Sequence, residues 1–207
     1  MQKRNKKYYS PSDLIRFMES PFASWMDRYS FEFPQISELK DEQDPLASIL
    51  QQRGFAHEHQ LENSFQEQGL SLVKIEAEND VEKKEATFSA MKQGVDVIAQ
   101  ARLEISHFTG YADFLIKVDG RSNLGDFHYE VWDAKLSKHL KPSYIIQLCC
   151  YAEMLEVVQG IRPQNIMVVL GSGERKNLRT TDYFQYYLGL KQSFLFAQAH
   201  FDPSNMP

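Results

Sequence analysis

Two aspartates and a lysine stand where their side chains could act together on a phosphate. Asp113 lies in one run of aromatic and branched residues, and Asp133 and Lys135 lie in a second. Both runs have the composition of β-strands. Residues two apart in a strand point to the same face, so Asp133 and Lys135 project together while Trp132 and Ala134 face the other way. We therefore expect two carboxylates and one ammonium group on one surface of a sheet.

This combination of groups favours metal-assisted hydrolysis. Carboxylate oxygens are the ligands that hard cations such as Mg²⁺ and Mn²⁺ prefer. A lysine beside them can position or activate a water molecule, or stabilise charge that develops on a phosphate. The sequence therefore predicts a phosphodiester hydrolase in which Asp113 and Asp133 hold the metal and Lys135 serves the attacking water.

Neighbouring strands must bring these residues together. The segment 120–125 begins and ends with glycine and has turn composition, which predicts an antiparallel pair around Asp113 and Asp133. A strand over 95–105 precedes them and completes a three-stranded meander. A buried strand over 165–170 follows after a helix, and this order predicts a parallel crossover beside the meander.

Two helices carry further polar candidates. The first spans 45–68, and its apolar face includes His57, so this side chain points inward. The second spans 144–158 and places Gln147 and Tyr151 one turn apart. An inward histidine, a half-buried glutamine and a core tyrosine are also common as purely structural residues, and the spacing alone leaves this alternative open. Glu58 is expected on a solvated helix face, with a supporting site role possible.

The remaining elements follow from local signals. We expect helices that begin at Ser10 and Ser20, with an aromatic face of the second packed on the core. The other expected segments are a loop over 31–44, a short strand over 71–76, a helix over 81–93, a strand or strand–turn over 180–187, a helix over 188–200 and an unstructured tail over 201–207.

Four motifs, in this order, resemble those of the PD-(D/E)XK nuclease superfamily and its RecB-type branch. His57 matches the upstream helical histidine, and Gly110-Tyr111-Ala112-Asp113 matches the first acidic motif. Asp133-Ala134-Lys135 matches the Asp/Glu-x-Lys motif. Gln147 and Tyr151 match the Gln-x-x-x-Tyr of the RecB branch. The resemblance covers residues 9–170.

The resemblance implies a fold and a set of ligands. The fold is α/β, a restriction-endonuclease-like mixed sheet flanked by helices. The metal, Mg²⁺ or Mn²⁺, would be held by His57, Asp113 and Asp133, with the carbonyl of Ala134 as a further ligand. Gln147 and Tyr151 would orient Lys135 or the nucleic-acid backbone.

Length and composition indicate one domain, 1–207, made of N-terminal helices and a loop (1–44), a catalytic core (45–170) and a C-terminal strand and helix (171–207). No apolar run is long enough to cross a bilayer, so we expect no membrane partner and a cytoplasmic location. Cys149 and Cys150 are adjacent and offer no disulfide framework. An iron–sulfur cluster generally needs four thiolates, so none is expected, and Ser20 stands where related proteins with a cluster carry a cysteine.

The expected function is a deoxyribonuclease that acts on single-stranded or frayed DNA. The net charge of −5 does not favour a nucleic-acid binder, although basic groups recur over 3–7, 135–141 and 175–179. Gly171-Ser172-Gly173 lacks the spacing of a phosphate-binding loop, and the chain has no Walker A motif. We therefore expect it to serve as the nuclease module of a larger nuclease–helicase system, with the helicase in the same polypeptide or as a partner. The alternatives are a non-catalytic nucleic-acid-binding or scaffold domain and a metal-dependent hydrolase of another substrate.

Overall fold

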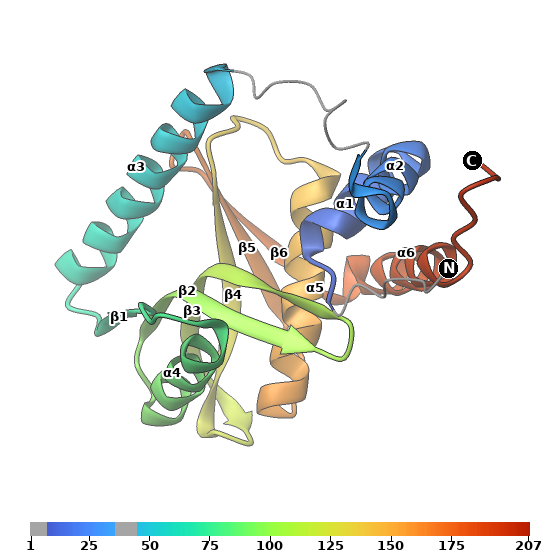
Figure 1. The fold of residues 1–207 in the computed structure, drawn as a ribbon. Helices are drawn as coiled ribbons and strands as arrows, with labels where there is room; N and C mark the ends of the chain where they lie inside the picture. Colours follow the sequence, from blue (N-terminus) through green and yellow to red (C-terminus); the bar gives the residue numbers. More distant parts are fainter. Residues whose placement is uncertain (1–7, 36–44) are drawn as a thin grey trace.

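The computed structural model describes residues 8–35 and 45–207, and it shows a six-stranded mixed sheet flanked by helices (Figure 1). The strands lie side by side in chain order: β1 (Leu72–Lys74), β2 (Val97–Ile105), β3 (Phe108–Ser122), β4 (Gly125–Lys135), β5 (Asn165–Leu170) and β6 (Arg175–Arg179). The helices are α1 (Pro11–Glu19), α2 (Pro21–Glu32), α3 (Pro45–Glu67), α4 (Asp80–Gln93), α5 (Pro142–Gln159) and α6 (Thr181–Ala199). The predicted α/β class is confirmed.

The connections follow the predicted order. Strands β2, β3 and β4 form the antiparallel meander. Helix α5 links β4 to the parallel strand β5, which confirms the predicted crossover. A second crossover through α4 links β1 to its parallel neighbour β2, and β6 closes the sheet antiparallel to β5. The glycines predicted to end α4 and α5 both adopt left-handed backbone, Gly94 at φ 69° and Gly160 at φ 74°.

The two faces of the sheet are covered unequally. Helix α3 lies over one face, where Leu61 and Phe65 pack against Phe114 and Trp132 (Figure 1). Helix α5 lies on the other face, where the larger core also takes in residues of α1, α4 and α6. The candidate site residues of β3 and β4 therefore lie between α3 and α5.

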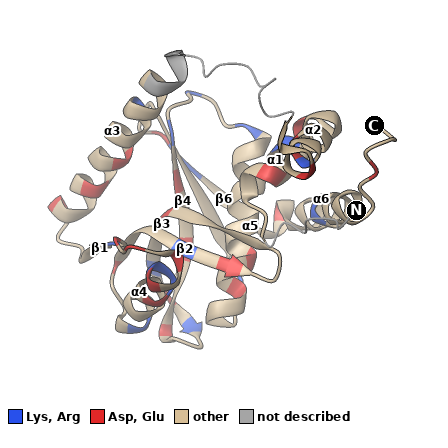
Figure 2. Cartoon of the chain, viewed as in Figure 1, with Lys and Arg blue, Asp and Glu red and all other residues tan. Residues whose placement is uncertain are grey.

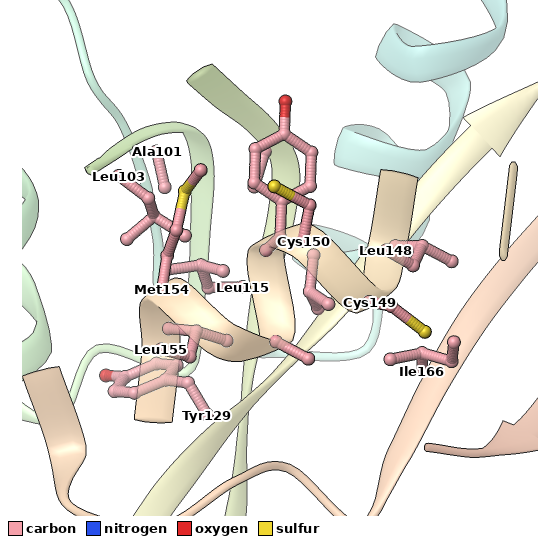
Figure 3. Packing of buried hydrophobic residues seen from close by; sticks show 14 of the residues in the cluster. Ala101, Leu103, Leu115, Tyr129, Leu148, Cys149, Cys150, Met154, Leu155 and Ile166 are labelled. Atoms are coloured by element: carbon pink, nitrogen blue, oxygen red, sulfur yellow. The ribbon is translucent and has the colours of Figure 1, made fainter. Parts of the chain in front are cut away.

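Helix α5 is the centre of the larger core. Cys149 and Cys150 are completely buried, and Figure 3 shows their sulfurs pointing apart, that of Cys149 toward Ile166. Burial raises the pKa of each thiol to about 12. Both cysteines are free thiols and act as small apolar core residues.

Both ends of α5 are fixed to β4 by glutamines. At the C-terminal end the completely buried Gln159 accepts from the Tyr129 N–H at 2.8 Å and donates to the Tyr129 carbonyl at 3.1 Å. The pairing of β4 with β5 begins at Val131, so the Gln159 amide supplies the ladder bonds that Tyr129 lacks on this side. At the N-terminal end Gln147 contacts Asp133.

The N-terminal helices begin as predicted, but the aromatic face of α2 does not pack on the central core. Ser10 and Ser20 both cap with their side chains. Phe22 is 45% exposed, and Trp25 packs on Phe201 of the C-terminal tail and donates to the carbonyl of Asp202 at 3.1 Å. That tail has no helix or strand, as expected.

Two boundaries differ from the prediction. The expected strand over 180–187 is wrong, because α6 begins at Thr181 and the strand before it is β6. The buried aromatic residues of this segment recur at helical spacing, and this pattern favours a helix over a strand; they are Phe184, Tyr187 and Phe194. Helix α2 runs to Glu32, into the expected loop, and the rest of that loop over 36–44 and the basic residues 3–7 lie outside the described residues.

Among the helices that the structure describes, none combines the length and the apolar character that crossing a bilayer requires.

Candidate active site

Asp113, Asp133 and Lys135 converge at one end of the β3–β4 pair. The Lys135 ammonium lies 2.9 Å from Oδ1 and 2.8 Å from Oδ2 of Asp133. Asp113 Oδ2 accepts a hydrogen bond from the backbone N–H of Ala134 at 2.9 Å. Asp133 is 1% exposed and Asp113 and Lys135 are partly buried, so the three groups share a sheltered position.

The strands produce this convergence by ending their regular pairing. The last paired residues on this side are Phe114 and Trp132, and beyond them the Ala134 N–H bonds to the Asp113 carboxylate instead of a backbone carbonyl. Trp132 and Ala134 pack in the cluster beneath α3, whereas Asp133 meets Gln147 of α5. The predicted alternation of faces along β4 is confirmed.

An irregularity in β2 lies beside Asp113. Val97 and Ala99 pack beneath α3, but Ala101 and Leu103 pack in the larger core, so the alternation of faces shifts at Gln100. Among the described residues Gln100 is the one non-glycine with positive φ, at 55°. Such backbone is unfavourable for an L-residue and persists where the surroundings enforce it, often at functional sites.

Glu58 of α3 completes the charged group. Its Oε2 accepts a hydrogen bond from the Gln100 side chain at 2.9 Å. Burial, and then the charge of Asp113, raises the pKa of Glu58 to about 7, while Lys135 opposes the rise. Glu58 is thus a half-buried member of the site, which favours the supporting site role over a fully solvated helix face. The sequence signal for this role is its position beside His57 in the helix.

Gln147 and Tyr151 contact the strands of the site, and their expected role in orienting Lys135 or the nucleic-acid backbone stays a prediction. Gln147 Nε2 donates to Asp133 Oδ1 at 3.2 Å. The Tyr151 hydroxyl donates to the carbonyl of Tyr111 at 2.7 Å, and its ring is 4% exposed. A Cβ on Gly110 would lie 2.8 Å from the Tyr151 hydroxyl oxygen, so the glycine lets α5 approach β3. The two α5 residues therefore set the positions of Asp133 and of the strand that carries Asp113.

The aspartates are electrostatically unfavourable in the protein alone. Burial raises the pKa of Asp113, with Lys135 and the Ala134 N–H acting against it. Burial and then the charge of Asp113 raise the pKa of Asp133 well above its ordinary value. Together with Glu58, three carboxylates face one lysine, so full ionisation would leave two uncompensated negative charges.

Lys135 stays protonated in this environment. Burial alone would lower its pKa, but the charges of Asp133 and Asp113 outweigh burial and raise it. The ammonium also lies 5.4 Å from the centre of the Tyr144 ring. Lys135 therefore lies here as a hydrogen-bond donor and a positive charge beside Asp133.

His57 lies against β5, the strand that pairs with β4. It lines a pocket between α3 and the turn that joins β5 to β6, and its Nε2 is 3.5 Å from the carbonyl oxygen of Val169. Among the described residues no three histidine, cysteine, aspartate or glutamate side chains are grouped so that they could hold a metal ion. The roles of His57 and of the Ala134 carbonyl as metal ligands stay predictions.

The donor chemistry fits a hard divalent cation. The acids that face one another offer carboxylate oxygens, the preferred ligands of Mg²⁺ and Mn²⁺. Buried Asp133 Oδ2 accepts no well-directed hydrogen bond from the described residues, although Lys135 lies within ion-pair distance of it. A divalent cation would offset the excess negative charge of this group.

No protein-family model matches the chain, and a search of curated proteins finds no matching sequence. The resemblance to the PD-(D/E)XK superfamily therefore stays a prediction, carried by the order of four motifs.

Proposed function

We propose that this chain is a Mg²⁺- or Mn²⁺-dependent deoxyribonuclease. The observation that carries the proposal is the convergence of Asp113, Asp133 and Lys135 at the end of the β3–β4 pair. Two buried carboxylates beside a protonated lysine form an arrangement that is unfavourable for stability and suited to phosphoryl chemistry.

Asp113 and Asp133 would hold the metal ion. Glu58 of α3 is the further candidate, because the charge of Asp113 raises the pKa of Glu58 as it does that of Asp133. A bound Mg²⁺ or Mn²⁺ supplies polarisation of the phosphate and neutralisation of charge on the leaving oxygen. In the hydrolysis, water forms a bond to phosphorus and gives up a proton to solvent, the bond from phosphorus to the leaving sugar oxygen breaks, and that oxygen takes up a proton from solvent.

The protein residues supply position and charge. The Lys135 ammonium orients the attacking water and stabilises negative charge on the phosphate oxygens. Gln147 fixes the orientation of Asp133, and Tyr151 fixes the strand beside Asp113. Although burial lowers the pKa of Lys135, the charges of Asp133 and Asp113 raise it above its ordinary value, which favours the donor role of the ammonium group.

The substrate we propose is single-stranded or frayed DNA. Figure 2 shows acidic residues along α3, while the connection from β4 to α5 carries Lys138 and Lys141. With a net charge of −5, affinity for duplex should be weak and sensitive to salt. We propose that a helicase, in the same polypeptide or as a partner, delivers the strand, and that the protein works in the cytoplasm, where buried thiols such as Cys149 stay reduced.

The decisive experiment is cleavage of labelled single-stranded and blunt duplex DNA with Mn²⁺ and with a chelator. We expect Mn²⁺-dependent cleavage that is faster on the single strand. Lys135→Ala should lower the rate by about 100-fold or more, while Lys92→Ala, a substitution of an exposed lysine on α4, serves as the control. Wild-type cleavage rates in Lys135→Ala would show that the assigned mechanism is wrong.

The third ligand is tested separately by calorimetric titration with Mn²⁺. If Glu58 supplies it, Glu58→Gln should weaken Mn²⁺ binding by about tenfold, on the scale of a residue that supports a metal site. His57→Ala tests the ligand predicted from the family motif. If His57→Ala weakens Mn²⁺ binding and Glu58→Gln does not, the third metal ligand is His57.

The rival function is a non-catalytic nucleic-acid-binding domain. One observation favours it: the Lys135 ammonium already lies within 2.9 Å of both Asp133 oxygens. DNA binding by the wild type without cleavage in Mn²⁺ would support this alternative.

A further inference from the structure

A polar pocket adjoins the candidate site on the α3 side. Its volume is about 400 Å³, and it lies between α3 and the turn that joins β5 to β6. Helix α3 contributes His57 and Gln60, and the other wall contributes Ser172, Gly173 and Arg175. We refer to it as the hairpin pocket.

Arg175 gives the pocket a fixed positive charge. Its guanidinium lies 5.2 Å from the centre of the Trp132 ring, close enough for a cation–π attraction that draws it to this wall. Among the described residues no carboxylate pairs with it, since its neighbour Glu174 is bound to Lys176 at 2.5 Å. An arginine that is oriented in this way and lacks an ion pair presents its donors to a ligand with negative oxygens.

The pocket is connected to the two aspartates through the shared strands and helix. Val169 lines the pocket and is paired with Ala134, the residue between Asp133 and Lys135. His57 of the pocket precedes Glu58 of the site in α3. A strand that crosses the site between α3 and the sheet would therefore pass the hairpin pocket.

The turn itself is held in place against the neighbouring connection. The Gly171 N–H donates to the carbonyl of Ser137 at 3.1 Å, and the Gly173 N–H donates to the carbonyl of Leu170 at 2.8 Å. A side chain at Gly171 would collide with the Leu136 carbonyl, so the glycine permits this close approach. The wall that carries Arg175 is therefore positioned before a ligand arrives, which reduces the entropy lost on binding.

We propose that the hairpin pocket binds a backbone phosphate of the DNA strand next to the phosphate that is cut. Arg175 pairs with the phosphate oxygens, and the Ser172 hydroxyl and the Gln60 amide are within the same pocket as further donors. This inference rests on the proposed nuclease function, and it assigns one side of the substrate path to the α3–hairpin wall.

The first test measures binding without cleavage. A fluorescent single strand of about twelve nucleotides is titrated in a chelator against the wild type, Arg175→Gln and Arg179→Gln. We expect Arg175→Gln to weaken binding by about fivefold or more and to reduce the slope of log K against log salt by about 0.7, the value for one phosphate contact on a single strand. Arg179 is the matched control, because it lies at the far end of β6 and pairs with Asp182.

Inorganic phosphate in the same titration distinguishes the strand from a free anion. Because strand and phosphate would share the Arg175 contact, phosphate should displace the strand more readily from the wild type than from Arg175→Gln. Phosphate binding that is lost in Arg175→Gln while strand affinity stays equal in both proteins would assign the pocket to the free anion and overturn strand binding. If Arg175→Gln and Arg179→Gln bind the single strand with the same affinity and the same salt slope, the proposal that the hairpin pocket binds a phosphate of the strand is wrong.

The second test separates this inference from the nuclease proposal. In Mn²⁺, Arg175→Gln should raise KM by about fivefold or more while kcat changes little, because the lost contact is made in both ground and transition states. A wild type that binds the strand through Arg175 but never cleaves it would remove the nuclease proposal and leave the pocket. If the wild type cleaves the strand with the same KM as Arg175→Gln, the nuclease proposal stands and the proposed role of the pocket is removed.

Discussion

At the scale of single residues, the acids of the site stand in an environment that disfavours their charge. Asp113 accepts one hydrogen bond, from Ala134, and its charge raises the pKa of both Asp133 and Glu58. An asparagine at position 113 could still accept the Ala134 hydrogen bond, but it would carry no charge. Replacement of an active-site acid by its amide commonly removes activity while the fold gains stability.

We therefore predict that Asp113→Asn is at least as stable as the wild type when metal is absent. The expected gain in the free energy of unfolding is about 1 kcal/mol, the common size of a single stabilising substitution. Cleavage should fall by about 100-fold or more. Urea unfolding in a chelator measures the first quantity, and the cleavage assay measures the second. Asp126→Asn, an exposed substitution at the start of β4, should change neither.

A clear loss of stability in Asp113→Asn would contradict this account. Such a loss would mean that the attraction between Asp113 and Lys135 stabilises the fold more than the repulsion between Asp113 and Asp133 destabilises it.

At the scale of elements, the contact between α5 and β3 depends on the absence of a side chain at Gly110. An added Cβ would meet the Tyr151 hydroxyl oxygen at 2.8 Å and Cδ of Pro11 at 3.1 Å, so α1 and α5 would both have to move. We predict that Gly110→Ala lowers the free energy of unfolding by about 1–3 kcal/mol, as overpacking does in other cores. Thermal or urea unfolding measures this change.

The source of the strain is tested by a second substitution. Tyr151→Phe removes the atom nearest to the new methyl group, so the double variant should recover part of the stability that Gly110→Ala loses. Gly189→Ala in α6, where an added Cβ meets nothing within 4 Å, should instead stabilise by about 0.5–1 kcal/mol. Equal effects of the two glycine substitutions would show that helix and strand propensity, not the close approach, governs position 110.

Asp96 ties three strands together and gives the fold a dependence on acid pH. Its carboxylate accepts from Ser71 N at 3.0 Å and Oγ at 2.6 Å, ahead of β1, and pairs with Lys117 of β3 at 2.5 Å. The Lys117 hydrogen bond, followed by those from Ser71, lowers the pKa of Asp96 to about 2. A lowered carboxyl pKa adds stability above the unfolded value of about 3.9, and this contribution is lost as pH falls toward about 2.

We predict that Asp96→Asn destabilises the protein by about 1 kcal/mol near neutral pH, a modest value because the carboxylate is close to solvent. The difference from the wild type should shrink as pH falls below about 4. Urea unfolding at several pH values measures it, with Asp119→Asn as an exposed control on β3. A difference that stays constant at acid pH would mean that the charge of Asp96 is not involved.

Local signals were sufficient for most elements but not for every boundary. Turn composition over 120–125 and the glycines at 94 and 160 mark chain reversals and helix ends that depend on neighbouring residues alone. The start of α6 was missed because Thr180–Tyr187 is rich in aromatic residues, which strands also favour. Only burial of Phe184 and Tyr187 against the core decides for the helix.

The sequence was sufficient to predict the aspartates and the lysine of the site, but not the contributions of Glu58 and Gln100. The period of β4 places Asp133 and Lys135 together in any strand. Consecutive residues of a helix differ by about 100° in direction, so the docking of α3 decides which of His57 and Glu58 faces Asp113. Gln100 carries no sequence signal, since glutamine is not a residue that favours positive φ.

At the scale of the whole molecule, the two walls of the site differ in how firmly they are packed. Helix α5 buries most of one side in the larger core. In the first half of α3, Ile49 and Leu50 are each 50% exposed and Phe55 is 58% exposed, while its buried apolar contacts come later, at Leu61 and Phe65. Stability against local opening follows buried apolar contact, so α3 should open more easily than α5.

We predict that amide hydrogens in the first half of α3 exchange about 100-fold faster than those in the middle of α5. Hydrogen exchange read by mass spectrometry measures this difference in the metal-free protein. Addition of a single strand to Asp133→Asn, which cannot cleave it, should slow exchange in the α3 segment around Gln60 and in the turn before Arg175, because the proposed phosphate position joins these two walls. The middle of α5 should not change, since its amides are already protected by the core. Equal exchange in α3 and α5 would show that α3 opens no more easily than α5. Protection by the strand at α5 alone would place the substrate path on the α5 side of the site.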